Sequence, residues 1–249
     1  MRFAVIVSKK DEAGQNIKQH IACPENAFLV EIEKDTIYFD EADLLQADIL
    51  IFATRHQSES KEKTLSLHFP GNFSDPKFGG TKAKFPKAPA SFAKQMFANL
   101  AEAGEGTEYK VTMEATHHGP TLAKPCIFIE IGSAPDQWRD GSAGKKIAGV
   151  IRKTILELQP RKHEVALGFG GTHYCAGFNK IELSENVAMG HICPKYNVSV
   201  LTKEIIHEMM ASTVEHVDYA LLDWKGLTSA DRQHITGILS EIGLPWKKL

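Results

Sequence analysis

The amino-acid sequence predicts an α/β protein of three layers, α/β/α, in which helices cover both faces of a largely parallel, mixed β-sheet. Short apolar runs typical of buried strands alternate with segments whose apolar residues recur at helical spacing. The chain has 249 residues, of which 43% are hydrophobic, and this is enough for a sizeable core. It shows no internal repeat and no linker that splits it, so we expect residues 1–249 to form a single domain.

The charge, the cysteine content and the length of the apolar runs indicate in which compartment the protein works and which partners it has. The formal net charge is −2, so a nucleic-acid partner would need a local basic patch. The four cysteines form no Cys-x-x-Cys motif, and no apolar run reaches the ~18 residues of a membrane span. The apolar run at the start is too short for a secretion signal. We therefore expect a cytoplasmic protein with reduced thiols and no membrane partner, either a monomer or a small homo-oligomer.

The first half of the chain reads as strands that alternate with helices. Asp48–Thr54 is a near-continuous apolar run and hence a buried, parallel strand. Phe92, Met96 and Leu100 are spaced for the core face of a helix that follows a long loop. The other expected elements are strands at Phe3–Val7, Phe28–Ile32, Thr36–Phe39, Leu65–Phe69 and Val111–Ala115, and a helix at Asp11–Ile21.

The second half continues the alternation. Ser133 supplies a capping hydroxyl for a helix that we expect to extend to Leu158, and Thr228 does the same for a final helix through Ile242. Gly190–Pro194 is expected within a looser segment. The remaining expected elements are strands at Pro125–Ile131, Glu164–Gly170 and Asp218–Leu222, and a helix at Thr202–His216.

Two adjacent histidines mark the stretch around which the chain is organised, Glu114-Ala-Thr-His-His-Gly-Pro-Thr121. His117 and His118 follow an expected strand on a Gly-Pro turn, and ligands bind at the carboxyl ends of strands in open α/β sheets. Because successive strand residues face opposite ways, we expect one histidine in a pocket and the other packed beneath it. A polar strand end with two solvated imidazoles is the alternative interpretation.

Further histidines follow other strand ends, namely His56, His173 and His191, and we expect most of them on the same rim. The sequence contains no Gly-x-Ser-x-Gly nucleophile elbow. A histidine-rich rim without a nucleophile fits a water activated by a general base, or a zinc-bound hydroxide. The pairs His173-x-Cys175 and His191-x-Cys193 would make a closed structural zinc site, although they match no known spacing.

A lysine-rich loop, Pro70–Pro89, leads into the helix that carries Phe92. No acidic residue occurs between Pro76 and Ala101, and phenylalanines interleave with the lysines. One interpretation is a solvated loop with anchoring phenylalanines, and the other is a surface that contacts a phosphate backbone. The lysines that would make such contacts are Lys77, Lys82, Lys84 and Lys87.

Six short motifs occur in a fixed order along nearly the whole chain. They are Ser8-Lys9, Arg55-His56, Thr116-His-His-Gly-Pro-Thr121, Gly170-Gly-Thr-His-Tyr174, Gly190-His191 and Asp223-Trp-Lys-Gly-Leu227. Together they resemble the archaeal and plant type of D-aminoacyl-tRNA deacylase. The resemblance implies hydrolysis of the ester between a D-amino acid and tRNA, a fold like that of phosphorylases and peptidyl-tRNA hydrolase, and dependence on zinc.

The resemblance also implies roles for individual residues. His117, His118, His173 and Thr121 would be catalytic, with the Thr121 hydroxyl donating to the ester oxygen. Residues that bind the substrate would be Arg55, His56, Gly170, Gly171 and Tyr174. Zinc ligands would be His117, His173 and His191. Contacts with tRNA would come from Lys77, Lys82, Lys84 and Lys87, aided by Arg152, Lys153, Arg161 and Lys162. An aminoacyl ester is already activated, so a positioned water, a base and an oxyanion donor suffice. We expect the N–H groups of Gly170 and Gly171 to be that donor.

The chain departs from the family pattern at two cysteines. After the His-Tyr pair the family usually has Ala-Pro and a basic residue, whereas Cys175-Ala-Gly follows here. Cys193 stands where an aliphatic residue is common. These cysteines are therefore poor candidates for zinc ligands, and histidines and carboxylates such as Glu130 are better ones.

Two alternative functions remain. One is another α/β hydrolase or phosphorylase that acts on a small metabolite, with the lysine-rich loop as a lid and a rate that varies little with salt. The other is a non-catalytic tRNA-binding protein, which would leave the acyl ester intact.

Overall fold

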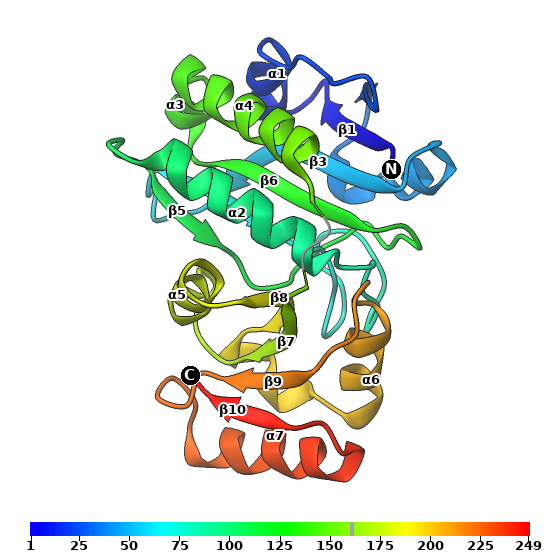
Figure 1. Ribbon diagram of the computed structural model, residues 1–249, viewed down its shortest axis with the longest axis vertical. Helices are drawn as coiled ribbons and strands as arrows, with labels where there is room; N and C mark the ends of the chain where they lie inside the picture. The colour runs from blue at the N-terminus through cyan, green and yellow to red at the C-terminus, as the bar shows by residue number, and fades with distance from the viewer. Residues whose placement is uncertain (160–161) are drawn as a thin grey trace.

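The computed structural model describes residues 1–159 and 162–249 and contains two β-sheets (Figure 1). The first sheet has six strands in the order β2-β1-β3-β6-β4-β5, and the second has four in the order β10-β9-β7-β8. The strand pairs are parallel except β4 with β6, which is antiparallel. The predicted class, α/β with a largely parallel, mixed sheet, is therefore confirmed. No helix in the described ranges is long and apolar enough to cross a membrane.

The first sheet is covered differently on its two faces. Helices α1, α2 and α4 pack on one face, which presents Val5 and Ile129. Two 3-10 helices, η1 and η2, cover apolar residues of the other face, where Ile37 of η1 packs near Phe52 and Phe128. The elements of this part are β1 Phe3–Ser8, α1 Glu12–Lys18, β2 Ala27–Ile32, η1 Thr36–Tyr38, η2 Asp40–Leu44, β3 Ile49–Gln57, β4 Thr64–His68, α2 Ala90–Gly104, β5 Lys110–Met113, β6 Cys126–Ser133, α3 Pro135–Trp138 and α4 Gly141–Glu157.

The second sheet shares a hydrophobic cluster with the first. Helix α2 packs against α4 and also against β8, and one cluster contains Phe97 of α2 together with Met189 of β8. On the opposite face, α6 and α7 contribute Ile206 and Leu239 to a second cluster. The elements of this part are β7 Glu164–Phe169, α5 Ala176–Ser184, β8 Val187–Cys193, η3 Lys195–Val200, α6 Lys203–Ala211, β9 Tyr219–Leu222, α7 Ser229–Ile242 and β10 Trp246–Lys248.

One predicted strand is a 3-10 helix. Thr36–Tyr38 bonds locally, because the N–H of Tyr38 donates to the carbonyl of Asp35 and that of Phe39 to the carbonyl of Thr36. These bonds occupy the backbone groups that a strand would use for its ladder.

The long helix expected to start at Ser133 is in fact two helices. Ser133 ends strand β6, and its hydroxyl donates to the carbonyl of Glu62. The longer helix, α4, begins later, because the carboxylate of Asp140 caps it by accepting the N–H of Ser142 at 2.8 Å.

Two other segments also differ from the sequence prediction. Gly190–Pro194 is not loose, because residues through Cys193 form strand β8, which pairs in parallel with β7. Helix α5 and strand β10 were not predicted. Thr228 does cap α7, and its hydroxyl and Asp231 form a capping box.

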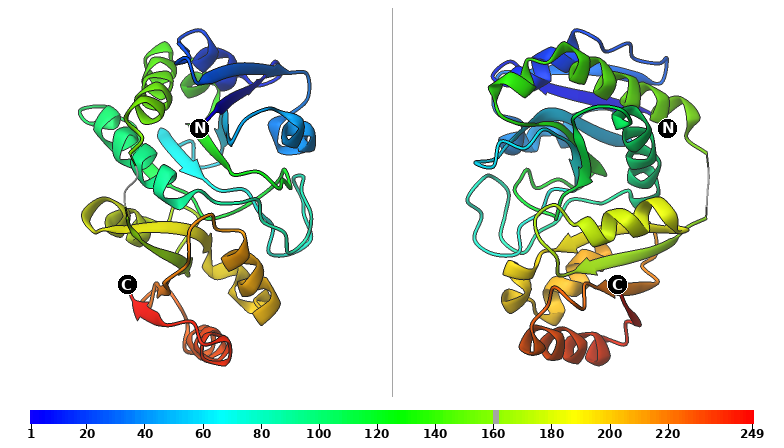
Figure 2. Two further views of the ribbon diagram at one scale, coloured as in Figure 1. Left: turned by 45° about the vertical axis from the view of Figure 1, so that its right-hand side comes forward. Right: turned by 90° about the vertical axis from the view of Figure 1, so that its left-hand side faces the viewer.

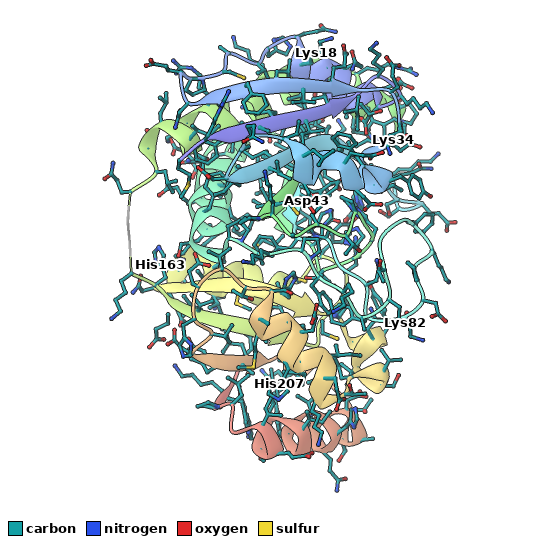
Figure 3. All side chains as sticks on the ribbon, turned by 90° about the vertical axis from the view of Figure 1, so that its right-hand side faces the viewer. Lys18, Lys34, Asp43, Lys82, His163 and His207 are labelled. Carbon is teal, nitrogen blue, oxygen red and sulfur yellow. The ribbon has the colours of Figure 1, made fainter. Side chains whose placement is uncertain are left out.

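The segment between β4 and α2 leaves the first sheet and runs beside α6 of the second (Figure 2). The N–H of Ala88 donates to the carbonyl of Ser212 at 2.7 Å. Phe73 and Phe85 are buried in the hydrophobic cluster of the second sheet. Lys82 lies at the outer edge of this segment (Figure 3). Two phenylalanines of this segment are therefore buried anchors, and the lysines lie on the outside.

Candidate active site

A cavity of about 1120 Å³ opens where the carboxyl ends of β1, β3 and β6 meet the turn that carries the histidine pair. Four histidines line it, namely His56, His117, His118 and His173. The prediction that the histidines lie at the carboxyl ends of parallel strands explains the position of His56 at the end of β3. It does not account for the histidine pair, because β4 and β5 run antiparallel to β6 and approach the cavity from the opposite direction.

Neighbouring strands direct polar side chains to one face of the first sheet. Thr54 of β3 lies opposite Glu130 of β6, and His68 of β4 lies opposite Phe128. Residues opposite one another share a face, as do residues two apart on a strand. His56, His68 and Glu130 therefore emerge on the same side, which is the face opposite α1, α2 and α4.

The stretch after β5 bridges the two sheets. The N–H of Ala115 donates to the carbonyl of His173 at 2.8 Å, and the N–H of Thr116 donates to the carbonyl of Ile192 at 3.0 Å. These bonds hold the loop after β7 against the first sheet. They bring His173 of one sheet next to the histidine pair of the other.

Both members of the histidine pair line the cavity. Strand β5 ends at Met113, and His118 has a φ of +48°, in the left-handed region, so the side chains no longer alternate. The N–H of Gly71 donates to the carbonyl of His118 at 2.7 Å and holds this conformation. The expectation that one histidine packs beneath the other is therefore wrong.

Five imidazoles and two carboxylates form one contiguous group, which we call the histidine cluster. The ring centroids of His117 lie 4.1 Å from His68, 4.4 Å from His118 and 4.7 Å from His173. The ring centroids of His173 and His56 are 5.6 Å apart. The members of the cluster are His56, His68, Glu114, His117, His118, Glu130 and His173.

Glu114 is the buried centre of the histidine cluster. One of its carboxylate oxygens lies 3.0 Å from Nε2 of His173, and the other lies 3.2 Å from Nδ1 of His56. Neither approach has the direction of a hydrogen bond, so both oxygens are buried without a donor among the described residues. Glu130 differs, because it accepts the hydroxyl of Thr54 at 2.6 Å. A buried carboxylate without donors is costly unless a cation neutralises it.

Backbone carbonyls fix the tautomers of three imidazoles. The Nδ1 atoms of His117 and His118 lie 2.8 and 2.5 Å from carbonyl oxygens, and that of His68 lies 3.2 Å from one. A carbonyl only accepts, so each Nδ1 carries the proton and each Nε2 keeps its lone pair in the neutral ring.

Burial and neighbouring charges separate the imidazoles into two kinds. Burial lowers the pKa of His117 well below its usual value and that of His118 to about 4, and the nearby charge of His68 adds to both effects. Burial also lowers the pKa of His56, but Glu114 and Glu130 outweigh it and raise that pKa to about 11. Burial lowers the pKa of His68 as well, but Glu130 outweighs it and raises that pKa. Two neutral imidazoles thus lie beside two imidazolium groups and their carboxylates.

The donor atoms fit a divalent cation. The ligand atoms of His56, Glu114 and His173 lie within 4.8 Å of one another, and those of His68, His117 and His118 form a second such group. Imidazole nitrogens and carboxylate oxygens are ligands that zinc accepts. The oxygens of Glu114, which have no hydrogen-bond donor among the described residues, are atoms that a cation would satisfy.

His191 lies outside this arrangement. It is fully buried, with Nδ1 3.2 Å from the hydroxyl of Thr116 and Nε2 within 3.2 Å of the carbonyls of Pro86 and Ser212. Both ring nitrogens are therefore engaged, and we remove His191 from the candidate zinc ligands. Its contacts support the backbone of the histidine turn instead.

Three other predicted site residues do not line the cavity. The hydroxyl of Thr121 accepts the N–H of Thr81 at 2.8 Å and holds the lysine-rich loop against the histidine turn. The N–H of Gly170 donates to the carbonyl of Cys193 at 2.8 Å, so it is not available as an oxyanion donor. Gly171 accepts a backbone N–H through its carbonyl, and it too lies outside the cavity lining.

Two predicted substrate-binding residues contact the cluster or the cavity wall. The hydroxyl of Tyr174 lies 3.2 Å from Nε2 of His56 and orients that ring. The guanidinium of Arg55 donates to the carbonyl of Lys10 at 2.9 Å and lines the cavity. Arg55 also lies 3.9 Å from Asp35, which limits its free positive charge.

Sequence reasoning missed two members of the histidine cluster, His68 and Glu114. His68 directly follows the apolar alternation of β4, so the strand-end rule applied to the other histidines would have found it. Glu114 begins the Glu-Ala-Thr-His-His motif, but its burial at the centre depends on contacts from the second sheet.

The lysines of the loop differ in their partners. Lys82 lies 3.0 Å from Asp75, and Lys84 lies 3.0 Å from Glu208, so both charges are compensated locally. Lys77 and Lys87 are exposed and have no ion pair with a described residue. Of the more distant cations, Lys153 pairs with Glu102, and Arg161 lies outside the described residues.

Comparisons with a family model and with proteins similar in sequence point to the same family. A family model described as D-aminoacyl-tRNA deacylase matches residues 44–247. Proteins named D-aminoacyl-tRNA deacylase from Methanococcus maripaludis strain C5 and Methanocaldococcus jannaschii are 32% and 31% identical, over 100% of both chains in each case. A third, from Methanosarcina acetivorans, is 33% identical over 98% of this chain and 91% of its own. A crystal structure described as a conserved protein of unknown function matches with a TM-score of 0.92 and 28% identity, over 100% of this chain and 95% of that one.

Proposed function

The chain belongs to the D-aminoacyl-tRNA deacylase family, and from this premise we propose that the histidine cluster activates a water molecule for the reaction. The water attacks the ester bond between a D-amino acid and the 3′ end of tRNA, and the products are the free amino acid and tRNA. The observation that carries this proposal is the convergence of five imidazoles and two buried carboxylates in one cluster, four of whose imidazoles line the cavity.

The hydroxyl groups that line the cavity favour direct attack by water over a covalent intermediate. The hydroxyl of Ser133 donates to the carbonyl of Glu62 at 2.7 Å, and that of Ser58 bonds Ser60 at 3.0 Å. Neither serine has an imidazole as a partner in the described part of the chain, and an unactivated hydroxyl is a weak nucleophile.

We assign the role of general base to His118, assisted by His117. The ring of His118 lines the cavity, and the bond from its Nδ1 to a backbone carbonyl leaves Nε2 free to accept a proton. Nε2 of His117 lies 3.7 Å from a carboxylate oxygen of Glu114, which would stabilise an imidazolium at that position. Within the pair, His118 is preferred because no carboxylate of a described residue pairs with its Nε2, which leaves that atom open to water.

Zinc is part of the proposal, and we place it at His56, Glu114 and His173, where binding would displace one proton from the His56 imidazolium. This group contains the buried carboxylate that has no hydrogen-bond donor in the described part of the chain, and it leaves the lone pairs of His117 and His118 for the reaction. When bound, zinc supplies a Lewis acid and lowers the pKa of a coordinated water. Tyr174 would hold the ring of His56 in the orientation that ligation needs.

The tRNA backbone is proposed to contact the cations of the lysine-rich loop that have no ion pair with a described residue. Lys77 and Lys87 are the candidates, because Lys82 and Lys84 already have acidic partners. A lysine that must first leave an ion pair gains less from a phosphate contact.

The decisive experiment compares hydrolysis of D-alanyl-tRNA and L-alanyl-tRNA by the wild-type chain, before and after removal of metal by a chelator. We expect hydrolysis of the D-ester, loss of the rate with the chelator and recovery with zinc. The variant His118→Ala should slow single-turnover hydrolysis by roughly 10²–10⁴-fold. His207→Ala is the matched control, because His207 is exposed on α6 (Figure 3). No hydrolysis of the D-ester by the zinc-loaded wild-type chain would refute the function, and a normal rate in folded His118→Ala would refute the assignment of the base.

A further inference from the structure

Two large aromatic side chains stand exposed at the mouth of the cavity. Tyr38 of η1 is 46% exposed, and Phe78 of the lysine-rich loop is 61% exposed. Both line the same cavity as His117 and His118. The other two phenylalanines of that loop, Phe73 and Phe85, are buried, so Phe78 does not serve as an anchor. Exposed aromatic groups beside a catalytic cavity indicate a binding role.

The backbone holds these aromatic groups at a fixed position relative to the histidine pair. The carbonyl of Phe78 accepts the N–H of Gly119, the residue after His118, at 2.9 Å. A Cβ on Gly119 would lie 2.6 Å from the carbonyl oxygen of Ile37, the residue before Tyr38. Three segments, residues 36–38, 78–80 and 117–119, therefore touch through their backbones, and the mouth of the cavity is preorganised.

Gly79, which follows Phe78, allows the segment of Phe78 to pack closely against the segment of Tyr38. Gly79 has a φ of +68°, and a Cβ at this position would overlap the carbonyl oxygen of Ile37 and lie 3.1 Å from the ring of Tyr38. The segment that carries Phe78 thus lies directly against the segment that carries Tyr38. A side chain at residue 79 would push the two apart.

We propose that Tyr38 and Phe78 form a stacking site for the terminal adenine base of the tRNA substrate. This inference rests on the proposed function, because it needs a substrate whose ester is attached to the terminal ribose. Aromatic side chains bind unpaired bases through their flat faces, and this contact tolerates any base. Tyr38 and Phe78 would be binding residues for the substrate that take no part in the proton transfers.

The connectivity of the substrate places the base at this position. The ester carbon must reach the histidine cluster, and only the ribose ring separates it from the base. The amino acid therefore enters the cavity beyond the mouth, while the base remains at the mouth. Lys77, which precedes Phe78 and has no ion pair with a described residue, is then placed to meet the next phosphate of the chain.

The test uses uncharged tRNA with and without its terminal adenosine, so that no amino acid and no hydrolysis are involved. The wild-type chain should bind the intact tRNA roughly 5- to 100-fold more tightly than the shortened one. The double variant Tyr38→Ala, Phe78→Ala should bind the two RNAs equally. The variant Tyr38→Phe, Phe78→Tyr should restore the difference, because it keeps both rings. Leu183→Ala, at an exposed apolar residue of α5, is the matched control for a lost surface side chain.

Two outcomes would overturn the stacking site. One is equal binding of the two RNAs by the wild-type chain, and the other is an unchanged preference in the double alanine variant. A companion measurement of KM with D-alanyl-tRNA and D-tyrosyl-tRNA checks the occupant. An effect of the variants on the tyrosyl ester alone would assign the aromatic site to the amino-acid side chain instead. Failure of the wild-type chain to hydrolyse either ester would count against the proposed function, whereas the binding comparison does not depend on it.

Discussion

Replacement of Glu114 by glutamine tests the centre of the histidine cluster. The amide has nearly the same volume as the carboxylate but carries no charge, and Glu114 is buried with no donor for either oxygen in the described structure. If this carboxylate helps to hold zinc, Glu114→Gln removes a ligand charge without opening a cavity. The expected result is weaker zinc binding in a protein that remains folded.

The magnitude follows from the position of the carboxylate. Even residues that only orient a metal ligand change affinity by ~10–100-fold, so a direct ligand should cost at least ~100-fold. That factor corresponds to ~2.7 kcal/mol of stabilisation lost at a given zinc concentration. In a chain of this length each kcal/mol moves the Tm by ~2–4 °C. The rise in Tm that zinc produces should therefore be ~5–10 °C smaller in the variant than in the wild type.

The assay is thermal melting with and without added zinc, together with the zinc content after gel filtration. Glu182→Gln is the matched control, because Glu182 is also almost fully buried but lies in α5, away from the cluster. Its response to zinc should equal that of the wild type. Equal zinc content and an equal zinc-induced rise in wild type and Glu114→Gln would refute the assignment of Glu114 as a ligand.

Three further predictions concern other parts of the molecule. Burial raises the pKa of Glu182 to about 8, so its contribution to stability is present below pH 4.5 and is lost as the pH rises towards 8. Glu182→Gln should remove this loss. The prediction would be contradicted if the Tm of the variant depended on pH between 5 and 8 in the same way as that of the wild type. Gly79→Ala should lower the free energy of unfolding, measured in urea, by more than ~3 kcal/mol because its Cβ would overlap a carbonyl. Gly106→Ala should cost only ~1–2 kcal/mol, since it shares the left-handed φ but has open space around it. Lys77→Ala should flatten the slope of log Kd for tRNA against log salt by ~0.7–0.9, and Lys82→Ala by less, because Asp75 already pairs with it; equal slopes would contradict this difference.

The fold class was predictable from local pattern, and the missed elements show where local pattern fails. Apolar runs such as Asp48–Thr54 identify buried strands because burial on both faces leaves a continuous signature. Thr36–Phe39 is also a short run of β-branched and aromatic residues, yet Thr36–Tyr38 forms a 3-10 helix because its backbone groups bond locally. The antiparallel pairing of β4 with β6 has no signature in either strand alone. That pairing directs His68 into the histidine cluster, against the ring of His117.

The site was predictable as a set of motifs and not as a geometry. His117, His118 and His173 could be identified from the sequence, because they follow predicted strands and lie near glycines. His191 has the same local signature, but its ring is occupied by Thr116 and two carbonyls behind the cavity. Contacts between distant segments decide which imidazoles keep a free nitrogen. His173 therefore joins the histidine cluster, whereas His191 supports the backbone beneath it.

The sequence by itself determined the family of this protein, the alternation of strands and helices, and the histidine pair at the centre of the site. Only the tertiary structure decided that Glu114 is buried among imidazoles, that His68 joins them, and that the segments carrying Tyr38 and Phe78 lie together at the cavity. The physical reason is that periodicity and motif spacing report on neighbours along the chain. The charge balance of a buried carboxylate, the free nitrogen of an imidazole and the position of an exposed ring depend on segments that only the packed sheets bring together.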